Sequence, residues 1–263
     1  MNKAEKLMIA RKQGGIAYLA GRWPLDPRRP TVVFLHGSGQ QGSFWQSQVD
    51  GLVDAANTIA VDLPGHGDSE GEGFCRVADY TQSVLNFITA IDAPSPIPCG
   101  LSLGGAIVLE LLLDHARIFR AGILANTGAR LKVLPVIIET VERDNDAHLK
   151  SLIEFAVAPV NRTDEETRRR VLACSTALPT VTANDFRACN AFDVMDRVPD
   201  IDLPVLVLSA DQDTLTPPKY AEWTAAQISG ARHVRIHEAG HMSPIERPQD
   251  VNAAITRFLE SLS

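Results

Sequence analysis

The chain of 263 residues has few cysteines, no long apolar run and no strongly basic stretch. Its four cysteines (Cys75, Cys99, Cys174 and Cys189) show no Cys-x-x-Cys spacing, so they predict neither a thiolate metal site nor a disulfide framework. No segment approaches the roughly 20 consecutive apolar residues that span a bilayer. We therefore expect no metal, no membrane partner and a cytoplasmic location.

Positive charge is scarce as well. The 25 lysines and arginines are outnumbered by 32 acidic residues, which gives a net charge of -7. Nucleic acid would repel such a chain unless a basic patch were concentrated on one face, and the run at 168–170 follows three acidic residues at 164–166. We therefore expect no nucleic-acid partner and a small-molecule substrate, with the oligomeric state left open.

Short apolar segments alternate with helical patterns in the first half of the chain. Residues 31–35 form a continuous apolar run, and an amphipathic helix is predicted near residues 77–91. Such alternation is typical of an α/β fold with a parallel sheet and helices on both faces. The strands are expected at 15–19, 31–35, 58–61, 121–124, 205–208 and 233–236.

The alternation stops between residues 128 and 200, where only helical patterns occur. This block interrupts a sheet protein, so we interpret it as a helical cap over the carboxyl edge of the sheet, where such folds bind ligands. The predicted organisation is a core in two parts, 1–127 and 201–263, with the cap at 128–200 between them.

The most informative stretch surrounds Ser102, in the pattern Gly-x-Ser-x-Gly between an apolar run and a helix. A serine becomes a nucleophile only when it is held beside a base and beside donors for the oxyanion. Gly100 and Gly104 would allow a sharp strand-to-helix turn, Gly105 would allow close packing of helix and strand, and the Leu103 amide would face the developing charge. Residues 67–71 match the same pattern without a preceding strand, so we expect Ser69 to be a loop residue.

A serine nucleophile needs a histidine base and a carboxylate to orient it. His241 lies in a loop between the last predicted strand and the last helix, and it is our candidate base. Asn126 follows the strand at 121–124 but cannot carry the charge. The acid is therefore expected in the loop after 205–208. We favour Asp213 over Asp211, because the later residue is better placed to reach from the edge of the sheet to a histidine in another loop.

The loop at residues 37–42 has two interpretations. It reads G-x-G-x-x-G, and Asp62 follows it by 20 residues, which would suit the pyrophosphate and ribose of a dinucleotide in an NAD-binding oxidoreductase. Alternatively, the Ser38 amide supplies a second oxyanion donor beside Leu103. We favour the second interpretation because the polar residues at the other strand ends predict a serine hydrolase.

Five segments together resemble the α/β-hydrolase family over nearly the whole chain. The resemblance implies an eight-stranded, mostly parallel sheet with helices on both faces and a helical cap, and it implies catalysis without a cofactor. It places the nucleophile at Ser102, the acid at Asp213, the base at His241 and the oxyanion amides at Ser38 and Leu103. The segments are His36–Gly39, Asp62–Ser69, Gly100–Gly105, Asp211–Pro217 and Gly240–Pro248.

The predicted reaction is the hydrolysis of a carboxylic ester, lactone or thioester. The sequence of Gly100–Gly105, Gly-Leu-Ser-Leu-Gly-Gly, resembles the corresponding segment of 3-oxoadipate enol-lactonases, but six residues do not assign a substrate. Hydrolysis of a C–C bond by the same residues, and a non-catalytic ligand receptor on the same fold, remain as alternatives. Pro98 departs from the family pattern, because a proline in a central strand predicts a short or bulged strand.

Overall fold

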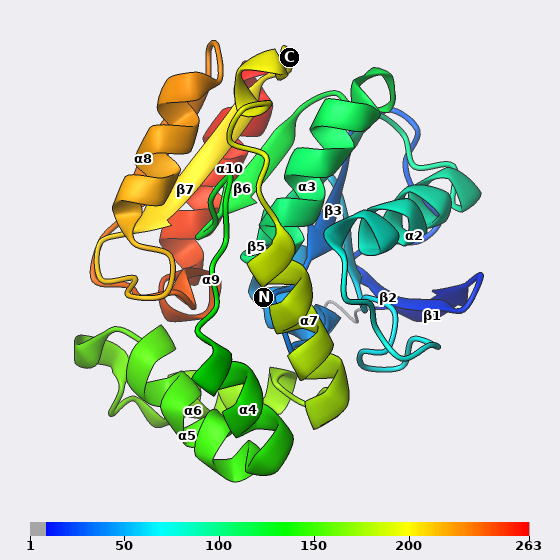
Figure 1. Cartoon of the computed structure of the whole chain (residues 1–263). Coiled ribbons are helices and arrows are strands. Elements are labelled where there is room, and N and C mark those ends of the chain that lie inside the picture. The colour runs from blue at the N-terminus through cyan, green and yellow to red at the C-terminus, as the bar shows by residue number, and fades with distance from the viewer. Residues whose placement is uncertain (1–8, 263) are drawn as a thin grey trace, which may run out of the picture.

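The computed structural model describes residues 9–262, which fold around one eight-stranded sheet (Figure 1). The strand order is β1-β2-β4-β3-β5-β6-β7-β8, and only the β1–β2 and β2–β4 pairs are antiparallel. The predicted fold class is confirmed. The strands are β1 (Ile9–Gln13), β2 (Ile16–Ala20), β3 (Thr31–Leu35), β4 (Asn57–Val61), β5 (Pro96–Leu101), β6 (Gly122–Ala125), β7 (Val205–Ala210) and β8 (Arg232–Ile236).

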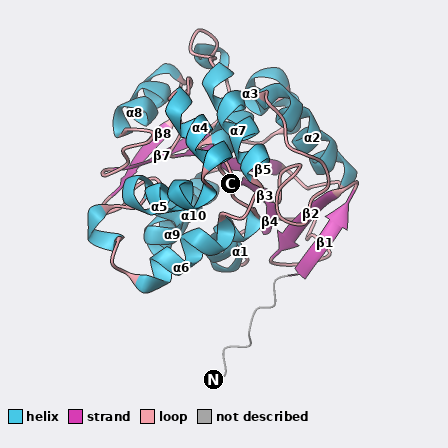
Figure 2. Ribbon diagram, turned by 60° about the horizontal axis from the view of Figure 1, so that its bottom comes forward, coloured by secondary structure: helices cyan, strands magenta, loops and turns pink. Residues whose placement is uncertain are grey.

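Helices cover both faces of this sheet, with β1 and β2 at one edge and β7 and β8 at the other (Figure 2). Side chains alternate along each buried strand, so Val33 and Leu35 pack into one core and Val32 and Phe34 into the other. No helix within residues 9–262 has the length and apolarity needed to cross a membrane. The first face carries α2 (Val77–Ala90), α3 (Leu103–Asp114) and α8 (Pro218–Gln227), and the second carries α1 (Gln46–Gly51) and α10 (Pro248–Ser261).

Four further helices lie between β6 and β7, in the segment 128–200 that we call the cap. Figure 1 shows α4, α5 and α6 grouped beyond one end of the sheet, while α7 runs from this group alongside α3. The side chain of Asp164 caps α6 by accepting from the Thr167 amide at 2.7 Å. The cap helices are α4 (Pro135–Arg143), α5 (Asn145–Ala156), α6 (Glu165–Cys174) and α7 (Pro179–Ala191). The remaining short helices are α9 (Ser243–Glu246) and the 3₁₀ turns η1 (Gly42–Trp45), η2 (Ala116–Ile118), η3 (Pro159–Asn161) and η4 (Val198–Asp200).

Strand β5 accommodates Pro98 without a bulge against β3. The two strands stay in register from the pair Thr31 and Pro96 to the pair Leu35 and Gly100. Pairing with β6 begins only at Cys99, after both prolines, as expected where backbone amides are missing. The proline therefore shortens one ladder and leaves the end of β5, which carries the candidate nucleophile, regular.

Candidate functional site

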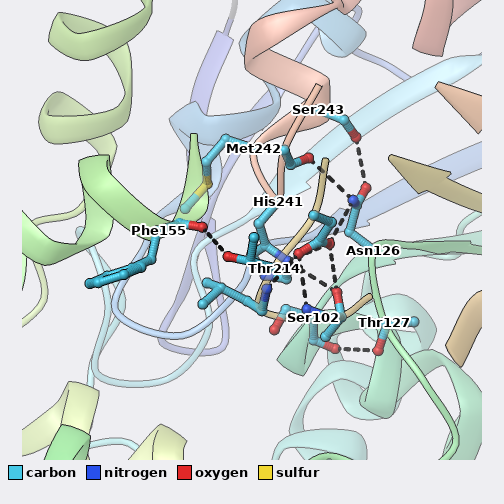
Figure 3. Close-up of polar contacts among 12 residues, drawn as sticks. Ser102, Asn126, Thr127, Phe155, Thr214, His241, Met242 and Ser243 are labelled. Atoms are coloured by element: carbon cyan, nitrogen blue, oxygen red, sulfur yellow. Dashed lines mark hydrogen bonds and ion pairs between the residues drawn. The ribbon is translucent and has the colours of Figure 1, made fainter. Parts of the chain in front are cut away.

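Ser102 lies at the sharp turn between β5 and α3, with φ 52° and ψ -113°. A positive φ is strained for a residue with a side chain, and the surrounding backbone holds this one in place. Its amide donates to the Ala125 carbonyl at 3.2 Å, and its carbonyl accepts from the Thr127 hydroxyl at 2.9 Å (Figure 3). The end of β6 therefore fixes the turn that presents the Ser102 side chain.

The glycines around Ser102 are required by close backbone contacts. A Cβ atom on Gly100 would lie 2.0 Å from the Gly104 carbonyl oxygen, and one on Gly104 would lie 2.3 Å from the Leu35 carbonyl oxygen. A Cβ atom on Gly105 would lie 2.4 Å from the Thr127 Cγ2 atom. The predicted reason for these glycines, close packing at the turn, is confirmed.

We expect Gly104→Ala to lower the free energy of unfolding by roughly 2 to 4 kcal/mol, because the overlap with β3 outweighs the better helix propensity of alanine. Thermal or urea unfolding measures the change. Gly230→Ala is the control, since its Cβ would meet nothing within 4 Å and only the φ of 72° opposes it. A smaller loss at Gly104 than at Gly230 would contradict this account of the turn.

His241 and Asp213 form a buried pair in which the His241 Nδ1 atom lies 2.9 Å from the Asp213 Oδ2 atom. The other carboxylate oxygen accepts from the amides of Leu215 and Thr216, both at 2.9 Å. Burial alone would raise the pKa of Asp213, but the charge and hydrogen bond of His241, with the other donors, reverse this and leave the pKa lowered. The carboxylate therefore stays ionised and holds the Nδ1–H tautomer, which leaves Nε2 as the nitrogen able to accept a proton.

Two polar residues that the sequence analysis did not assign complete this pair. The Asn126 amide nitrogen donates to the Asp213 Oδ2 atom at 2.9 Å, and its oxygen accepts from the Ser243 hydroxyl at 2.7 Å. The Thr216 hydroxyl donates to the same Oδ2 atom at 2.7 Å and lies 3.1 Å from His241 Nδ1. Helix α8 begins at Pro218, so Thr216 lies outside it and its side chain belongs to the carboxylate network.

The alternative acid, Asp211, points elsewhere. Its Oδ2 atom lies 3.3 Å from Nδ1 of the exposed His237, and its Oδ1 atom accepts from the Ala239 amide at 3.4 Å. The two aspartates of this loop thus pair with different histidines. Only the Asp213 pair is buried, so the arrangement favours Asp213 as the acid.

The loop after β3 lies directly beside Ser102, since a Cβ atom on Gly37 would lie 3.5 Å from the Ser102 Cβ atom. The Gly37 carbonyl accepts from His36 Nδ1 at 2.8 Å and from the Gln40 amide at 3.3 Å. Because this carbonyl shares a peptide plane with the Ser38 amide, these bonds also fix the direction of the Ser38 N–H. Neither the Ser38 amide nor the Leu103 amide donates a hydrogen bond to another group within residues 9–262.

The dinucleotide interpretation of this loop finds no support in the geometry. The Asp62 Oδ1 atom accepts from the Gly42 amide at 2.6 Å, and its Oδ2 atom accepts from the Asp68 amide at 2.9 Å. The carboxylate that would have bound a ribose therefore joins two loops. Ser69 is a loop residue as expected, and its hydroxyl donates to the Asp62 carbonyl at 2.7 Å.

A comparison with known proteins assigns the family. The sequence model of the Alpha/beta hydrolase family matches residues 32–254. The chain belongs to this family. This α/β hydrolase is 24% identical over 268 residues to 3-oxoadipate enol-lactonase 1 of Acinetobacter baylyi, with both chains fully covered. It is 28% identical over 253 residues to a pimeloyl-[acyl-carrier protein] methyl ester esterase of Stenotrophomonas maltophilia, covering 90% of this chain and 95% of the relative.

Solved structures agree on the fold of this α/β hydrolase. The crystal structure of the enol-lactonase from Burkholderia xenovorans superposes with a TM-score of 0.86 at 23% identity, covering 96% of this chain and all of the other. A structure of a thermophilic esterase gives a TM-score of 0.80 at 28% identity and 98% coverage of both. The names of the two sequence relatives, an enol-lactonase and a methyl ester esterase, agree with the prediction of a carboxylesterase-like enzyme.

A cavity of about 760 Å³ opens between the strand ends and the cap of this α/β hydrolase. Ser38, Ser102 and His241 lie on its wall, so the structure brings the predicted nucleophile, base and oxyanion loop to one space. Within residues 9–262, no group of three or more His, Cys, Asp or Glu side chains could hold a metal ion. The apolar wall is formed mainly by Leu101, Leu131, Val133, Leu134, Val136, Ile137, Leu152, Phe155, Phe186, Leu215 and Met242.

Proposed function

We propose that this protein is a serine hydrolase that cleaves a carboxylic ester, lactone or thioester through an acyl-enzyme intermediate. The observation that carries the proposal is the buried Asp213–His241 pair, whose histidine lies on the wall of the same cavity as Ser102. Ser102 itself occupies a strained strand-to-helix turn. The names of the relatives, enol-lactonase and methyl ester esterase, support the same class of reaction.

In the proposed first half-reaction, the Ser102 hydroxyl attacks the carbonyl carbon while His241 Nε2 accepts its proton. The oxyanion then receives hydrogen bonds from the Ser38 and Leu103 amides, which have no other acceptor within the described residues. The imidazolium, stabilised by the Asp213 carboxylate, returns the proton to the leaving alkoxide or thiolate. The carbonyl re-forms, and the acyl group stays on Ser102.

In the second half-reaction, a water molecule loses its proton to His241 and attacks the acyl carbon. The same two amides stabilise the new oxyanion, and the returning proton releases Ser102. The acid product leaves, and the net reaction consumes one water. Every group in this sequence is a side chain or amide of the chain, so the proposal requires no cofactor.

The cavity wall indicates an uncharged, predominantly apolar acyl or alcohol group. Lys132 is the one Lys, Arg, Asp or Glu on the wall in the described part of the chain, and its Nζ atom donates to the Asn190 carbonyl at 2.9 Å. His148 also lines the cavity, and burial lowers its pKa, so its imidazole is neutral. The opening is bordered by exposed apolar side chains, among them Leu134, Val136 and Phe155.

A series of p-nitrophenyl esters with acyl chains from acetate to decanoate tests the proposal. We expect kcat/KM to rise by about threefold to fourfold per added methylene until the cavity is filled, because each buried methylene contributes about 0.8 kcal/mol. Release of p-nitrophenol measures the rate. Binding without turnover across the series would favour the receptor alternative, and cleavage of a 1,5-diketone but of no ester would favour the C–C hydrolase.

A further inference from the structure

A buried carboxylate on the cap reaches into the core of the molecule. Asp185 lies on α7 and is completely shielded from solvent. Its Oδ2 atom accepts from the Gly39 amide and from His66 Nε2, both at 2.8 Å. Its Oδ1 atom accepts from the Tyr80 hydroxyl at 2.5 Å. One cap side chain therefore binds three separate core segments, and one of these is the loop that carries Ser38.

The partner histidine is charged. His66 Nδ1 lies 3.1 Å from the Pro64 carbonyl oxygen and Nε2 lies beside the Asp185 carboxylate, so both ring nitrogens face acceptors and both carry a proton. Burial by itself would lower the pKa of His66, but the charge and hydrogen bond of Asp185 outweigh it and leave the pKa raised. Besides Asp185, the titratable groups around His66 are His36, Tyr80 and Asp62.

The neighbouring histidine, His36, is uncharged. The His36 ring is centred 4.8 Å from the His66 ring, and burial together with the His66 charge holds the pKa of His36 well below its usual range. Its Nε2 atom accepts from the Leu63 amide at 3.0 Å, so Nδ1 carries the proton that it donates to the Gly37 carbonyl. The charge on His66 thus helps to keep His36 neutral, and the Leu63 amide selects the tautomer whose Nδ1–H fixes the Ser38 peptide plane.

The cap also holds the residue that follows Ser38. The Gly39 amide binds Asp185, and the Gly39 carbonyl accepts from the Ala177 amide at 3.3 Å. Gly39 has φ 71°, and a Cβ atom on it would lie 2.9 Å from the side chain of Thr182 on α7. Both polar backbone groups of Gly39 are therefore bound by the cap, while Gly37 is bound by the core.

We propose that Asp185 is a positioning residue that orients the oxyanion loop, so that the Ser38 amide is in place only while α7 is docked on the core. The inference rests on the proposed function. A buried ion pair stabilises a fold poorly, because desolvation offsets most of the attraction, and an apolar pair of the same volume would serve stability as well. An apolar pair could not accept the hydrogen bond from the Gly39 amide, and we infer that holding this amide is the role of the carboxylate.

The first test is Asp185→Ala, assayed on the best p-nitrophenyl ester of the wild-type enzyme, because an asparagine would keep an oxygen able to accept from the Gly39 amide. We expect kcat to fall roughly 10- to 100-fold with KM changed less than about twofold, because a displaced donor weakens transition-state binding and leaves ground-state binding intact. Asp193→Ala is the matched control, since Asp193 follows α7 and makes an exposed ion pair with Arg130 at 3.8 Å. The control should keep wild-type kcat.

A double variant separates positioning from stability. In Asp185→Ala with His66→Phe, neither partner is left as an unpaired buried charge, so we expect part of the loss in Tm seen in Asp185→Ala to be recovered. The proposal requires kcat to stay low, because the Gly39 amide still lacks its acceptor. Recovery of kcat together with Tm, or a kcat of Asp185→Ala within twofold of wild type, would overturn it.

The protonation of His66 can be measured without substrate, so it tests the role of Asp185 separately from the proposed function. In NMR titrations of the protein with ¹³C-labelled histidine, we expect His66 to lose its imidazolium proton at a higher pH in the wild type than in Asp185→Ala, because the carboxylate raises its pKa. If the wild type cleaves no ester, the proposed function fails while this result still reports on the pair. A His66 titration in an active wild type that does not differ from that in Asp185→Ala would show that the pairing with Asp185 is absent, and it would defeat the inference alone.

Discussion

Replacing Ser102 with alanine is expected to abolish covalent labelling by a fluorophosphonate probe and to lower kcat on every ester tested by roughly 10⁴-fold or more. The probe mimics the attacked carbonyl and reacts only with an activated hydroxyl, which in this structure lies in a strained turn on the cavity wall. Intact-mass spectrometry measures the adduct, and peptide mapping locates it.

The chain contains its own control for this experiment. Ser69 occupies a second Gly-x-Ser-x-Gly sequence, but its hydroxyl accepts from the Ala17 amide at 2.8 Å and donates to the Asp62 carbonyl, so it serves the loop structure. We expect Ser69→Ala to lose about 1 kcal/mol of stability and to be labelled like the wild type. Undiminished labelling of Ser102→Ala would remove the nucleophile from the proposal.

The second large effect is expected from Asp213→Asn, which should lower kcat roughly 10²- to 10⁴-fold without unfolding the protein. The asparagine can turn its NH₂ group toward His241 Nδ1, which stabilises the tautomer with the proton on Nε2. An Nε2 atom that already carries a proton cannot accept one from Ser102. Single-turnover release of p-nitrophenol measures this step directly.

Asp211→Asn is the matched variant, because it makes the same change two residues earlier in the same loop. Its carboxylate faces the exposed His237, so we expect kcat to stay within about twofold of wild type. The reverse ranking of the two variants would transfer the acid role to Asp211. Equal losses would show that the loop conformation, rather than one carboxylate, governs activity.

The residues predicted from the sequence share one property, which is that each follows a recognisable strand. Ser102 follows β5 and Asp213 follows β7, while His241 lies in the loop between β8 and α9. Since the carboxyl ends of parallel strands meet at one edge of a sheet, their convergence could be inferred once the alternation of strands and helices was recognised. The glycines of the turn were predictable for the same reason.

The residues that escaped prediction act through partners distant in the chain. Asp185 lies within a cap helix and binds Gly39 and His66, which are 146 and 119 positions away, and no local pattern indicates such a pairing. Asn126 cannot serve as the acid, but an asparagine at a strand end near a predicted carboxylate could have been predicted to donate a hydrogen bond to it, as Asn126 does to Asp213. Thr216 is the exception, because Asp213 lies only three positions earlier, and only the fold shows that the Thr216 hydroxyl binds this carboxylate.

The order of the strands places the proposed oxyanion loop and the proposed proton-transfer groups on opposite sides of Ser102. Strand β3, with the loop that carries Ser38, lies on one side of β5, while β6, β7 and β8 lead to the proposed proton-transfer groups, Asp213 and His241, on the other. Substitutions on opposite sides should therefore combine almost additively, except at residues that contact the other side. Examples are Gln40, whose Nε2 atom lies 3.3 Å from the Met242 sulfur, and Gln48, whose Nε2 atom donates to the Pro244 carbonyl at 3.2 Å. A protein engineer could vary charge stabilisation and basicity as two nearly independent parameters and screen two small libraries in place of one large combinatorial library.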